Sequence, residues 1–253
     1  MRFDLSGRTA LVTGGASGIG LAAATMLAEA GCRVAINHLA DDSRGPEQVA
    51  TLRGRGLDVI GAPGDVGDAA DCDRMVAAAI ADLGRLDFLA NNAGTPGSRT
   101  SIPSAELDRI TEALWQTLVQ VNLLGVFRCA KAAAPALRAA GGAVVNTASI
   151  AGLNSAGSSL AYGATKAGVI SLTKNLARAL APEVRVNAVA PGAVDSPWMI
   201  EWSNDQRASS IDRALLQRRC TPEDIAEVMV FLLAGAAMVT GQTIVVDGGL
   251  TLG

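Results

Sequence analysis

Short apolar runs rich in β-branched residues alternate along the chain with longer Ala- and Leu-rich stretches that have helical spacing. Because the short runs are almost continuously apolar, they are typical of parallel strands covered on both faces. We expect strands at 9–14, 33–37, 57–62, 86–91, 142–149, 184–190 and 243–248. We expect helices near 18–30, 44–55, 68–83, 104–138, 160–181 and 222–234. The alternation predicts a three-layer, doubly wound α/β fold with a seven-stranded parallel sheet.

One segment, 192–221, departs from this alternation. It is long and polar, and it contains two of the three tryptophans, Trp198 and Trp202. Such a segment suits a loop and helix that cover a site, and it equally suits a variable surface loop. No linker or change of composition divides the chain. We therefore expect residues 1–253 to form one domain, with a small substrate lid at about 192–221.

The overall composition narrows the class of protein. With 253 residues, 49% of them hydrophobic, and a mean hydropathy of +0.31, the chain can bury a sizeable core. No apolar run reaches the roughly 18–20 residues of a membrane span, and the N-terminus lacks the order of a signal peptide. We expect a soluble, cytoplasmic protein without a membrane partner. A net charge of −3 and the lack of a basic block argue against nucleic acid as a partner.

The cysteines and the histidine limit the chemistry further. Cys32, Cys72, Cys129 and Cys220 lie far apart and form no C-x-x-C pair, so we interpret them as reduced residues without a catalytic role. His38 is the only histidine. A multi-histidine metal site is therefore impossible, and we expect no metal.

A glycine-rich turn follows the first expected strand. The stretch "TGGASGIG" covers residues 13–20 and opens the first expected helix. Such a turn presents backbone N–H groups and the positive end of a helix to a pyrophosphate. A turn that serves only tight packing has the same composition. Its position at the start of a βα series favours the nucleotide-binding interpretation.

Acid–base chemistry is offered by a tyrosine and a lysine. Tyr162 is the only tyrosine of the chain, and Lys166 follows four positions later on the same expected helix face. A phenol with an ordinary pKa of about 10 is a poor base at neutral pH, and a nearby ammonium lowers that pKa. Ser149 ends an expected strand at the sheet edge where ligands bind in such folds. Taken singly, Lys166 also fits a solvated helix face and Ser149 a strand-end cap.

These motifs stand in a recognisable order. "TGGASGIG", with G-x-x-x-G-x-G spacing, "NNAG" at 91–94, "YGATK" at 162–166 and "PGAVDSPWM" at 191–199 together resemble the short-chain dehydrogenase/reductase family over essentially the whole chain. The resemblance implies a Rossmann-type fold and NAD(P)-dependent hydride transfer between the cofactor and a secondary alcohol or ketone. It implies four catalytic residues, namely Asn122, Ser149, Tyr162 and Lys166. In the family, the backbone carbonyl of the asparagine holds a water that links the lysine to solvent, although Asn122 also fits a residue that kinks a helix.

The resemblance also indicates where the dinucleotide binds. The cofactor-binding residues it implies are Gly14, Ser17, Gly18, Ile19, Gly20, Asn37, His38, Asp65, Val66, Asn92, Ala93, Gly94, Tyr162, Lys166, Pro191, Gly192, Val194 and Ser196. Among them, Asp65 and Val66 hold the adenine, while the backbone of Val194 and the hydroxyl of Ser196 hold the nicotinamide carboxamide. Ser196 stands where the family usually has threonine. Asp65 or Asp68 also fits a helix cap, and Asn91 fits a structural role.

The end of the second strand bears on the choice of cofactor. An acid at this position favours NAD, because it binds the ribose hydroxyls and repels a 2′-phosphate. The strand ends "AINHL", so that His38 stands at the acid position, with Asn37 as a further donor and Arg44 nearby. These residues favour NADP(H). Asp41 and Asp42, and Ser17 where NADP-binding members often have a basic residue, keep NAD(H) open. His38 also fits an exposed loop residue.

The substrate and the assembly are less constrained. Apolar residues with scattered hydroxyls are expected around the site, with Trp198, Met199 and Trp202 as candidate lid residues that also fit simple packing, and with Arg99 near the mouth. Glu183 stands where carrier-protein reductases tend to have an arginine, although Lys174 and Arg178 are basic. We therefore favour a free small alcohol or ketone over a carrier-bound 3-oxoacyl chain, and both over a non-catalytic nucleotide-binding protein. The family resemblance implies a homotetramer, with a dimer as the second choice.

Overall fold

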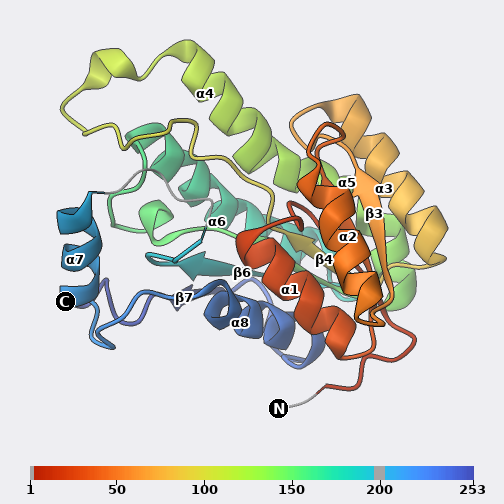
Figure 1. The fold of residues 1–253 in the computed structure, drawn as a ribbon. Coiled ribbons are helices and arrows are strands. Elements are labelled where there is room, and N and C mark those ends of the chain that lie inside the picture. Colours follow the sequence, from red (N-terminus) through yellow and green to blue (C-terminus); the bar gives the residue numbers. More distant parts are fainter. Residues whose placement is uncertain (1–2, 197–202) are drawn as a thin grey trace.

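The fold is described from a computed structural model that covers residues 3–196 and 203–253. Seven parallel strands form one sheet in the order β3-β2-β1-β4-β5-β6-β7 (Figure 1). Their bounds are β1 Thr9–Val12, β2 Arg33–His38, β3 Val59–Pro63, β4 Phe88–Asn91, β5 Ala143–Thr147, β6 Arg185–Pro191 and β7 Thr243–Val246. Each lies within one residue of the expected run or inside it, so the predicted seven-stranded doubly wound sheet is confirmed.

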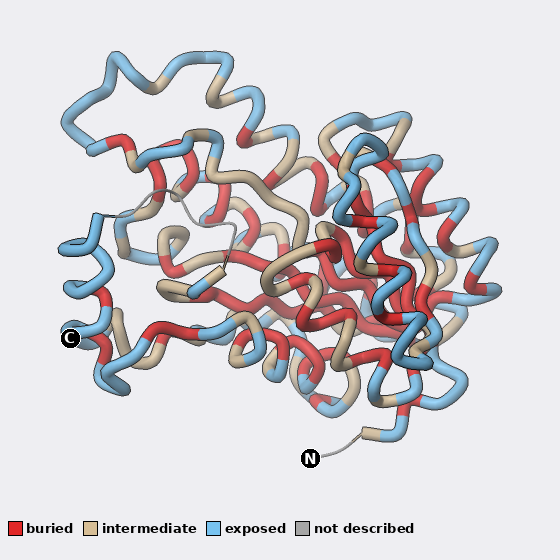
Figure 2. The backbone as a smooth tube through the Cα atoms, viewed as in Figure 1, coloured by how far each residue is buried: buried red, intermediate tan, exposed pale blue. Residues whose placement is uncertain are grey.

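Helices cover both faces of the sheet and complete the three layers. They are α1 Gly18–Glu29, α2 Arg44–Gly54, α3 Ala69–Leu83, α4 Glu112–Leu118, α5 Gly125–Ala140, α6 Leu160–Leu180, α7 Asn204–Asp212 and α8 Pro222–Ala234. One core contains residues of α1, α2 and α8, and the opposite core contains residues of α3, α5 and α6. Figure 2 shows the buried strands running between these layers. Within the described ranges, no helix is both long and apolar enough to cross a membrane.

Strand alternation explains why the runs had to be apolar throughout. In β1, Val12 packs into the core beneath α1 and α8, whereas its neighbour Leu11 packs into the core beneath α3 and α5. Both side chains are fully buried. A polar residue at either position would be buried without a partner, which is why these strands carry no two-residue polar pattern.

The single helix expected at 104–138 is wrong. A 3₁₀ turn at Leu107–Arg109 precedes α4, and a π-helical segment at Val119–Leu124 separates α4 from α5. The helix begins late because the Thr111 side chain accepts a hydrogen bond from the Leu114 amide and caps α4. The π-helical segment contains Asn122, whose side chain bonds to backbone outside the helix. Such segments frequently occur at functional sites.

The segment 192–221 is anchored at both ends. Val194 pairs with Cys220 as an isolated parallel bridge, so the segment leaves and returns at one point beside β6. Within it, Ser203 and Gln206 form a capping box that starts α7. The expected lid residues Trp198, Met199 and Trp202 lie outside the described residues.

Candidate active site

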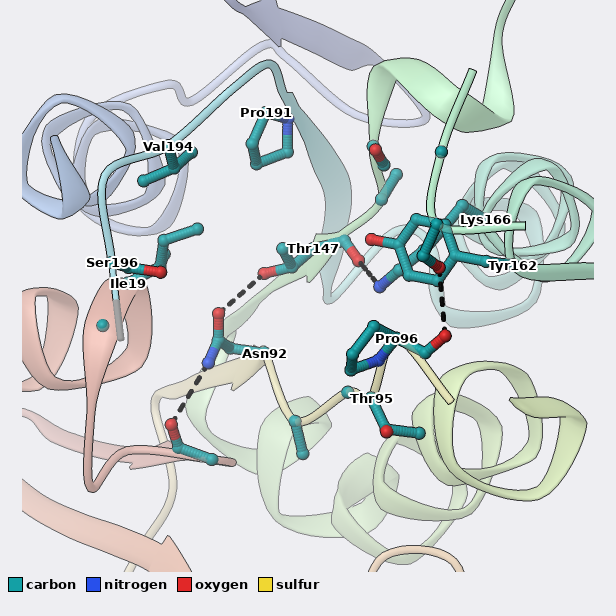
Figure 3. Close-up of a pocket in the computed structure, with 18 of the residues that line it drawn as sticks. Ile19, Asn92, Thr95, Pro96, Thr147, Tyr162, Lys166, Pro191, Val194 and Ser196 are labelled. Carbon is teal, nitrogen blue, oxygen red and sulfur yellow. Dashed lines mark hydrogen bonds between the residues drawn. The ribbon is translucent and has the colours of Figure 1, made fainter. Parts of the chain in front are cut away.

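A large cavity opens along the carboxyl ends of the strands, where the strand order reverses between β1 and β4. Its volume is about 1120 Å³. The loops that follow β1 to β6 line it, together with α6 and α7 (Figure 3). Of the residues predicted from the sequence, all line this cavity except Gly20 and Asn122. Those two lie directly behind its wall.

The glycine-rich turn is shaped by close backbone approaches. Gly14 has a left-handed φ of +60°, and a Cβ on it would lie 2.8 Å from the Cα of Ala93. A Cβ on Gly20 would lie 2.3 Å from the carbonyl oxygen of Gly14. Only glycine fits at both positions. The first turn of α1 has no acidic residue and no side-chain cap on Ser17, so its amides and the helix dipole face the cavity.

Asn37 is hydrogen-bonded within the fold. Its Oδ1 accepts a hydrogen bond from the Gly14 amide at 3.1 Å, and its Nδ2 donates to the carbonyls of Ala62 and Gly64 at 3.0 and 2.9 Å. Both amide protons are therefore used within the fold. Asn37 thus holds the glycine-rich turn onto the sheet, and it also lines the cavity. Its part in cofactor binding stays a prediction.

His38 is buried rather than exposed. Its Nδ1 lies 2.8 Å from the carbonyl oxygen of Leu39. The ring packs under the start of α2, where a Cβ on Gly45 would lie 2.1 Å from its Cγ. Only 7% of the residue is exposed, so the reading of His38 as a solvent-exposed loop residue is wrong. At this end of the cavity, Leu39 and Arg44 are exposed and Asp42 is half-buried.

An ion pair stands at this end. The Arg44 guanidinium donates to both oxygens of Asp42, from Nε at 2.8 Å and from Nη2 at 2.7 Å. This bond lowers the pKa of the Asp42 carboxyl below its ordinary value. The entrance at the end of β2 therefore carries one cation and one anion held together, an exposed Arg44 and a half-buried Asp42.

The loops after β3 and β4 contribute backbone and amides. Asp65 accepts from the Gly67 amide at 2.7 Å, while Asp68, and not Asp65, caps α3. Val66 is buried beside it. Asn91 donates to the Asn146 side chain at 2.9 Å inside the sheet, as a structural residue does.

Asn92, by contrast, lines the cavity and bonds to two other loops. Its Nδ2 donates to the carbonyl of Gly14 at 3.2 Å, and its Oδ1 accepts from the Thr147 hydroxyl at 3.3 Å (Figure 3). It thereby ties the glycine-rich turn to the end of β5. Ala93 and Gly94 follow it on the cavity surface.

The loop after β6 approaches the start of α1. A Cβ on Gly18 would lie 3.6 Å from the Cβ of Ser196, and a Cβ on Gly192 would lie 2.6 Å from that of Asp247. Pro191, Val194 and Ser196 line the cavity on this side (Figure 3). The Ser196 side chain thus lies beside the first turn of α1.

The tyrosine and lysine lie side by side, one turn apart on α6. Tyr162 is 7% exposed and Lys166 is 4% exposed. The Nζ of Lys166 donates to the Thr147 carbonyl at 2.8 Å and lies 5.7 Å from the centre of the Tyr162 ring. Ser159 caps the helix by accepting from the Tyr162 amide at 3.1 Å, which fixes where the phenol stands.

Ser149 completes this group. It follows β5, its hydroxyl accepts from the Ala151 amide at 3.1 Å, and it hydrogen-bonds the side chain of Tyr162. The strand end and the helix thus bring together three side chains that are seventeen positions apart in sequence at most. A carbonyl oxygen placed between Ser149 and Tyr162 could accept from both hydroxyls.

Burial governs the protonation of the pair. Desolvation raises the pKa of Tyr162 to about 12, against the opposing effect of its hydrogen bond with Ser149. Desolvation also lowers the pKa of Lys166 to about 8. The sequence predicted that the ammonium would depress the tyrosine pKa, and in the protein without cofactor the opposite direction holds. At neutral pH the phenol is protonated and can donate, and the lysine is still largely charged.

Asn122 lies behind the lysine and is fully buried. Its Oδ1 accepts from the Thr95 amide at 2.8 Å, and its Nδ2 donates to the Thr95 carbonyl at 2.9 Å. A Cβ on Gly94 would lie 3.2 Å from the Asn122 Oδ1 and 3.6 Å from the Lys166 Nζ. The asparagine side chain therefore shapes the loop after β4 around the lysine. Its backbone, in the π-helical segment, departs from ordinary helical hydrogen bonding.

Several residues that line the cavity or support its wall were not named from the sequence. Thr147 supplies both the carbonyl for Lys166 and the hydroxyl for Asn92, and only its place two residues before Ser149 hinted at this. The polar face of α7 and the residues after it line the cavity through Asp205, Gln206, Ser209, Ser210 and Arg213. Arg219 is also there, 6% exposed, with its Nε 3.1 Å from Asp195. The residues from α7 onward belong to the segment 192–221 that was expected as a lid, but no local pattern singles them out within it.

Comparison with known proteins places this architecture in a family. A family model described as enoyl-(acyl carrier protein) reductase matches residues 14–251. A solved short-chain dehydrogenase/reductase from Burkholderia xenovorans is 38% identical and superposes with a TM-score of 0.88, covering 97% of this chain and 98% of its own. The chain belongs to the short-chain dehydrogenase/reductase family. It is an oxidoreductase of that family, as its motifs predicted.

Two curated relatives show the range of activities near this member of the family. The granaticin polyketide synthase ketoacyl reductase 2 of Streptomyces violaceoruber is 40% identical over 249 residues. The cis-4-hydroxycyclohexanecarboxylate dehydrogenase of Sinomonas cyclohexanicum is 40% identical over 248 residues. Each comparison covers 96% of this chain and 96% of the relative. The short-chain dehydrogenase/reductase family thus includes, at equal similarity, a reductase of ketoacyl groups and a dehydrogenase of a ring alcohol.

Proposed function

We propose that this protein transfers a hydride reversibly between a nicotinamide cofactor, preferably NADP(H), and a small secondary alcohol or ketone. The observation that carries the proposal is the group on the wall of the cavity formed by the buried Tyr162 and Lys166 with the half-buried Ser149. The phenol is protonated at neutral pH and stands one helical turn from a largely charged lysine. This is the state required to donate a proton to a carbonyl oxygen.

The residues present fit a dinucleotide. At Gly14 and Gly20, a side chain would collide with neighbouring backbone, so only glycine allows this turn. The first turn of α1 offers its amides to a phosphate. When bound, the cofactor supplies the hydride and, in oxidised form, a positive charge that favours the phenolate. Asp65 and Val66 would hold the adenine, while Val194 and Ser196 would orient the carboxamide. Asn92, Ala93 and Gly94 would line the path between them.

The side chains divide the proton chemistry among themselves. Ser149 would hold the substrate oxygen by a hydrogen bond, and Tyr162 would donate its proton to that oxygen in reduction or accept it in oxidation. Lys166 would stabilise the phenolate and renew its proton. Asn122 would shape the loop beside Lys166, and its backbone carbonyl would hold a water that connects the lysine to solvent. The angle at which substrate meets cofactor would be fixed by these contacts.

The preference for NADP(H) rests on Arg44. No carboxylate stands at the end of β2, where the residues are Asn37 and His38. Asn37 hydrogen-bonds within the fold and His38 is buried. Arg44 lines the cavity at this end and can exchange its bond with Asp42 for one to a 2′-phosphate. NAD(H) is the alternative, because the Asp42 carboxylate opposes the phosphate.

For the substrate, we infer a free small alcohol or ketone. The wall beside Tyr162 combines apolar groups with the hydroxyls of Ser155 and Ser158, and α7 adds further polar side chains. The segment 192–221 would act as the substrate lid of this one-domain enzyme. A 3-oxoacyl chain on a carrier protein is the second candidate, since the ketoacyl reductase relative is as similar as the ring-alcohol dehydrogenase.

We also infer a homotetramer, with a dimer as the second choice, in the cytoplasm. Apolar side chains are exposed on the edge strand β7, at Ile244 and Val245, and on α8 at Phe231. A second exposed phenylalanine, Phe127, lies on α5. Unpaired strand edges and apolar helix faces of this kind are commonly covered by a second subunit. Light scattering of the purified protein measures the assembly directly.

The test of the function is a turnover assay. NADPH and NADH would be offered with a panel of sugars, polyols, cyclic ketones and a 3-oxoacyl thioester, and the absorbance of the reduced cofactor followed. We expect oxidation of NADPH with at least one free ketone. Tyr162→Phe should lose this activity and still bind NADPH. Activity that survived in Tyr162→Phe would contradict the assigned proton donor, and binding of NADPH without any turnover would favour a nucleotide-binding protein.

A further inference from the structure

Two of the four cysteines, far apart in sequence, meet inside the protein. Cys72 lies in the first turn of α3 and Cys129 lies in α5, 57 positions later. The helices pack against each other, and the two Sγ atoms are 3.4 Å apart. Both residues are buried, at 0% and 1% exposure. The sequence had led us to interpret all four cysteines as isolated.

The other two thiols have different surroundings. The Sγ of Cys32 points at the carbonyl of Arg33, 3.6 Å away, and that of Cys220 points at the carbonyl of Val246, 3.5 Å away. Burial raises the pKa of both thiols, that of Cys32 to about 12. They are therefore suitable internal controls for any chemistry of the Cys72–Cys129 pair.

The geometry of the pair is close to that of a covalent link. A disulfide has an S–S distance of about 2.05 Å, so the two sulfur atoms would have to approach by about 1.4 Å. Such a displacement can be shared between side-chain rotation and a small shift of the two helices. Two thiols held this near each other need no unfolding to react.

We propose that Cys72 and Cys129 form an oxidant-sensitive pair that a peroxide converts to a disulfide between α3 and α5. The Cys72 sulfur attacks one peroxide oxygen, the O–O bond breaks, and water leaves, which yields a sulfenic acid. The Cys129 sulfur then attacks that sulfenic sulfur, the S–O bond breaks, and a second water leaves. In sum, two thiols are oxidised and one hydrogen peroxide is reduced to two waters.

The order of the two steps follows from the hydrogen bond between the thiols. Either sulfur can donate in this bond. With Cys129 as the donor, the bond lowers the pKa of Cys72, and the same contact, with burial, raises the pKa of Cys129. Cys72 is thus the better nucleophile toward the oxidant, and Cys129 is the resolving thiol. Since neither sulfur lies at the surface, only an oxidant about as small as water should reach them.

The pair lies directly beneath the loop 65–67. On the α3 side, the Cys72 amide donates to the Asp68 carbonyl at 3.0 Å, and the neighbouring Asp71 accepts from the Asp65 amide at 2.9 Å. On the α5 side, Arg128, next to Cys129, donates to the Gly67 carbonyl at 2.8 Å. A link that pulls α3 and α5 together therefore acts on both supports of this loop.

The consequence for the cofactor rests on the proposed function, which gives Asp65 and Val66 the adenine. If the loop shifts when the disulfide forms, the adenine contacts loosen. We expect the oxidised protein to bind NADPH and NADH several-fold more weakly, by the same factor for both, because both cofactors carry the same adenine. Reduction with dithiothreitol should restore the original affinity.

The experiment treats the whole protein with hydrogen peroxide and maps the thiols by mass spectrometry after alkylation under denaturing conditions. The expected product is a cross-linked peptide pair containing Cys72 and Cys129, with a loss of two hydrogen atoms, while Cys32 and Cys220 stay alkylated. Oxidised glutathione, which is much larger, should give no cross-link. The variant Cys72→Ala should lose the cross-link, whereas the matched control Cys32→Ala should still form it.

The outcomes separate the inference from the proposed function. A sulfinic or sulfonic acid at Cys72 without a cross-link, or equal oxidation of Cys32 and Cys220, would overturn the pair. A cross-link with unchanged affinity for NADPH would overturn its coupling to the loop 65–67. If the cross-link forms but the protein with reduced thiols binds neither cofactor, the redox pair is supported and the proposed function is contradicted.

Discussion

The two ends of the cavity differ in how far their ionisable side chains are buried. At one end, Tyr162 and Lys166 are 7% and 4% exposed. The Tyr162 amide donates to the Ser159 hydroxyl, and the Lys166 Nζ donates to the Thr147 carbonyl. At the other end, the Arg44 side chain is 59% exposed and pairs with Asp42. The first pair is held by the strand β5 and the helix α6. In the second pair, Asp42 lies in the short loop between β2 and α2, and Arg44 is the first residue of α2.

This difference teaches what each end is able to do. Burial raises the pKa of Tyr162 to about 12 and lowers that of Lys166 to about 8. An exposed ion pair, in contrast, contributes little to stability and changes partners easily. The buried end can tune a proton donor, and the exposed end can choose between cofactors. Substitutions at the two ends should therefore differ in size and in kind.

The largest effect is expected at Lys166. Lys166→Met keeps the volume but removes the charge and the bond to the Thr147 carbonyl. We expect kcat to fall by about 10²–10³-fold, because the phenolate loses its stabilising ammonium, while the dissociation constant of NADPH changes far less. Steady-state rates and cofactor fluorescence measure the two. A comparable loss in cofactor affinity would show that the lysine mainly binds, and that the two ends do not divide the work as described.

The next effect concerns stability and pH. Lys166 has a pKa of about 8 in the folded protein and an ordinary value of 10.5 when unfolded. Between these values the unfolded chain binds the extra proton, so the free energy of unfolding rises as pH rises from about 8 to 10. We expect a gain on the order of 1–3 kcal/mol over this range. Tyr162, with its raised pKa, lowers stability only above pH 10.

Urea denaturation at several pH values checks this linkage. Lys166→Met provides the control, since the pH-dependent gain should be missing there while other titrating groups are unchanged. A wild-type curve parallel to that of the variant from pH 8 to 10 would mean that the lysine is not desolvated in solution.

A smaller effect is expected at the exposed end. Arg44→Ala should weaken NADPH binding by about tenfold through the lost contact to the 2′-phosphate, and should leave NADH binding nearly unchanged. Binding titrations of the four cofactor forms decide this, with Arg53→Ala on the same helix as the matched control. Equal losses for NADPH and NADH would remove Arg44 from cofactor discrimination.

The smallest effect is expected for its partner. Asp42→Asn keeps the shape, removes the negative charge and frees Arg44. NADPH should bind a few-fold tighter at low salt, and raising the salt concentration should reduce the gain, because exposed charges are screened. The same titrations at low and high salt are the measurement. A gain that is unaffected by salt would indicate a change of loop structure rather than of charge.

The sequence predicted the sheet well and the contacts less well. Strands such as β1 and β5 are buried at every position and mostly apolar, because both faces of the sheet are covered. This requirement shows in the local sequence pattern. The helix at 104–138 was wrong because the same Ala- and Leu-rich periodicity continues through the π-helical segment, whose cause is a bond from Asn122 to the distant loop at Thr95.

The candidate site shows the same division. Tyr162 and Lys166 are four positions apart, so their common face follows from helix geometry. The environment of Asn37 depends on Gly14, Ala62 and Gly64, which no pattern around position 37 reveals. The meeting of Cys72 with Cys129 likewise depends on how α3 packs on α5. Contacts between residues distant in sequence therefore could not be predicted from the local pattern of this chain.

The hydrogen bond between Gly14 and Asn37 has a consequence for redesigning this protein. An aspartate at position 37 could still accept from the Gly14 amide, but its carboxylate would face the carbonyls of Ala62 and Gly64 that now receive two donors. The change would damage the phosphate-binding turn together with the selectivity it was meant to alter. The segment from Leu39 to Arg44 is free of this constraint. Under the proposed function, architecture and cofactor preference rest on separate residues, so the preference could evolve without disturbing the sheet.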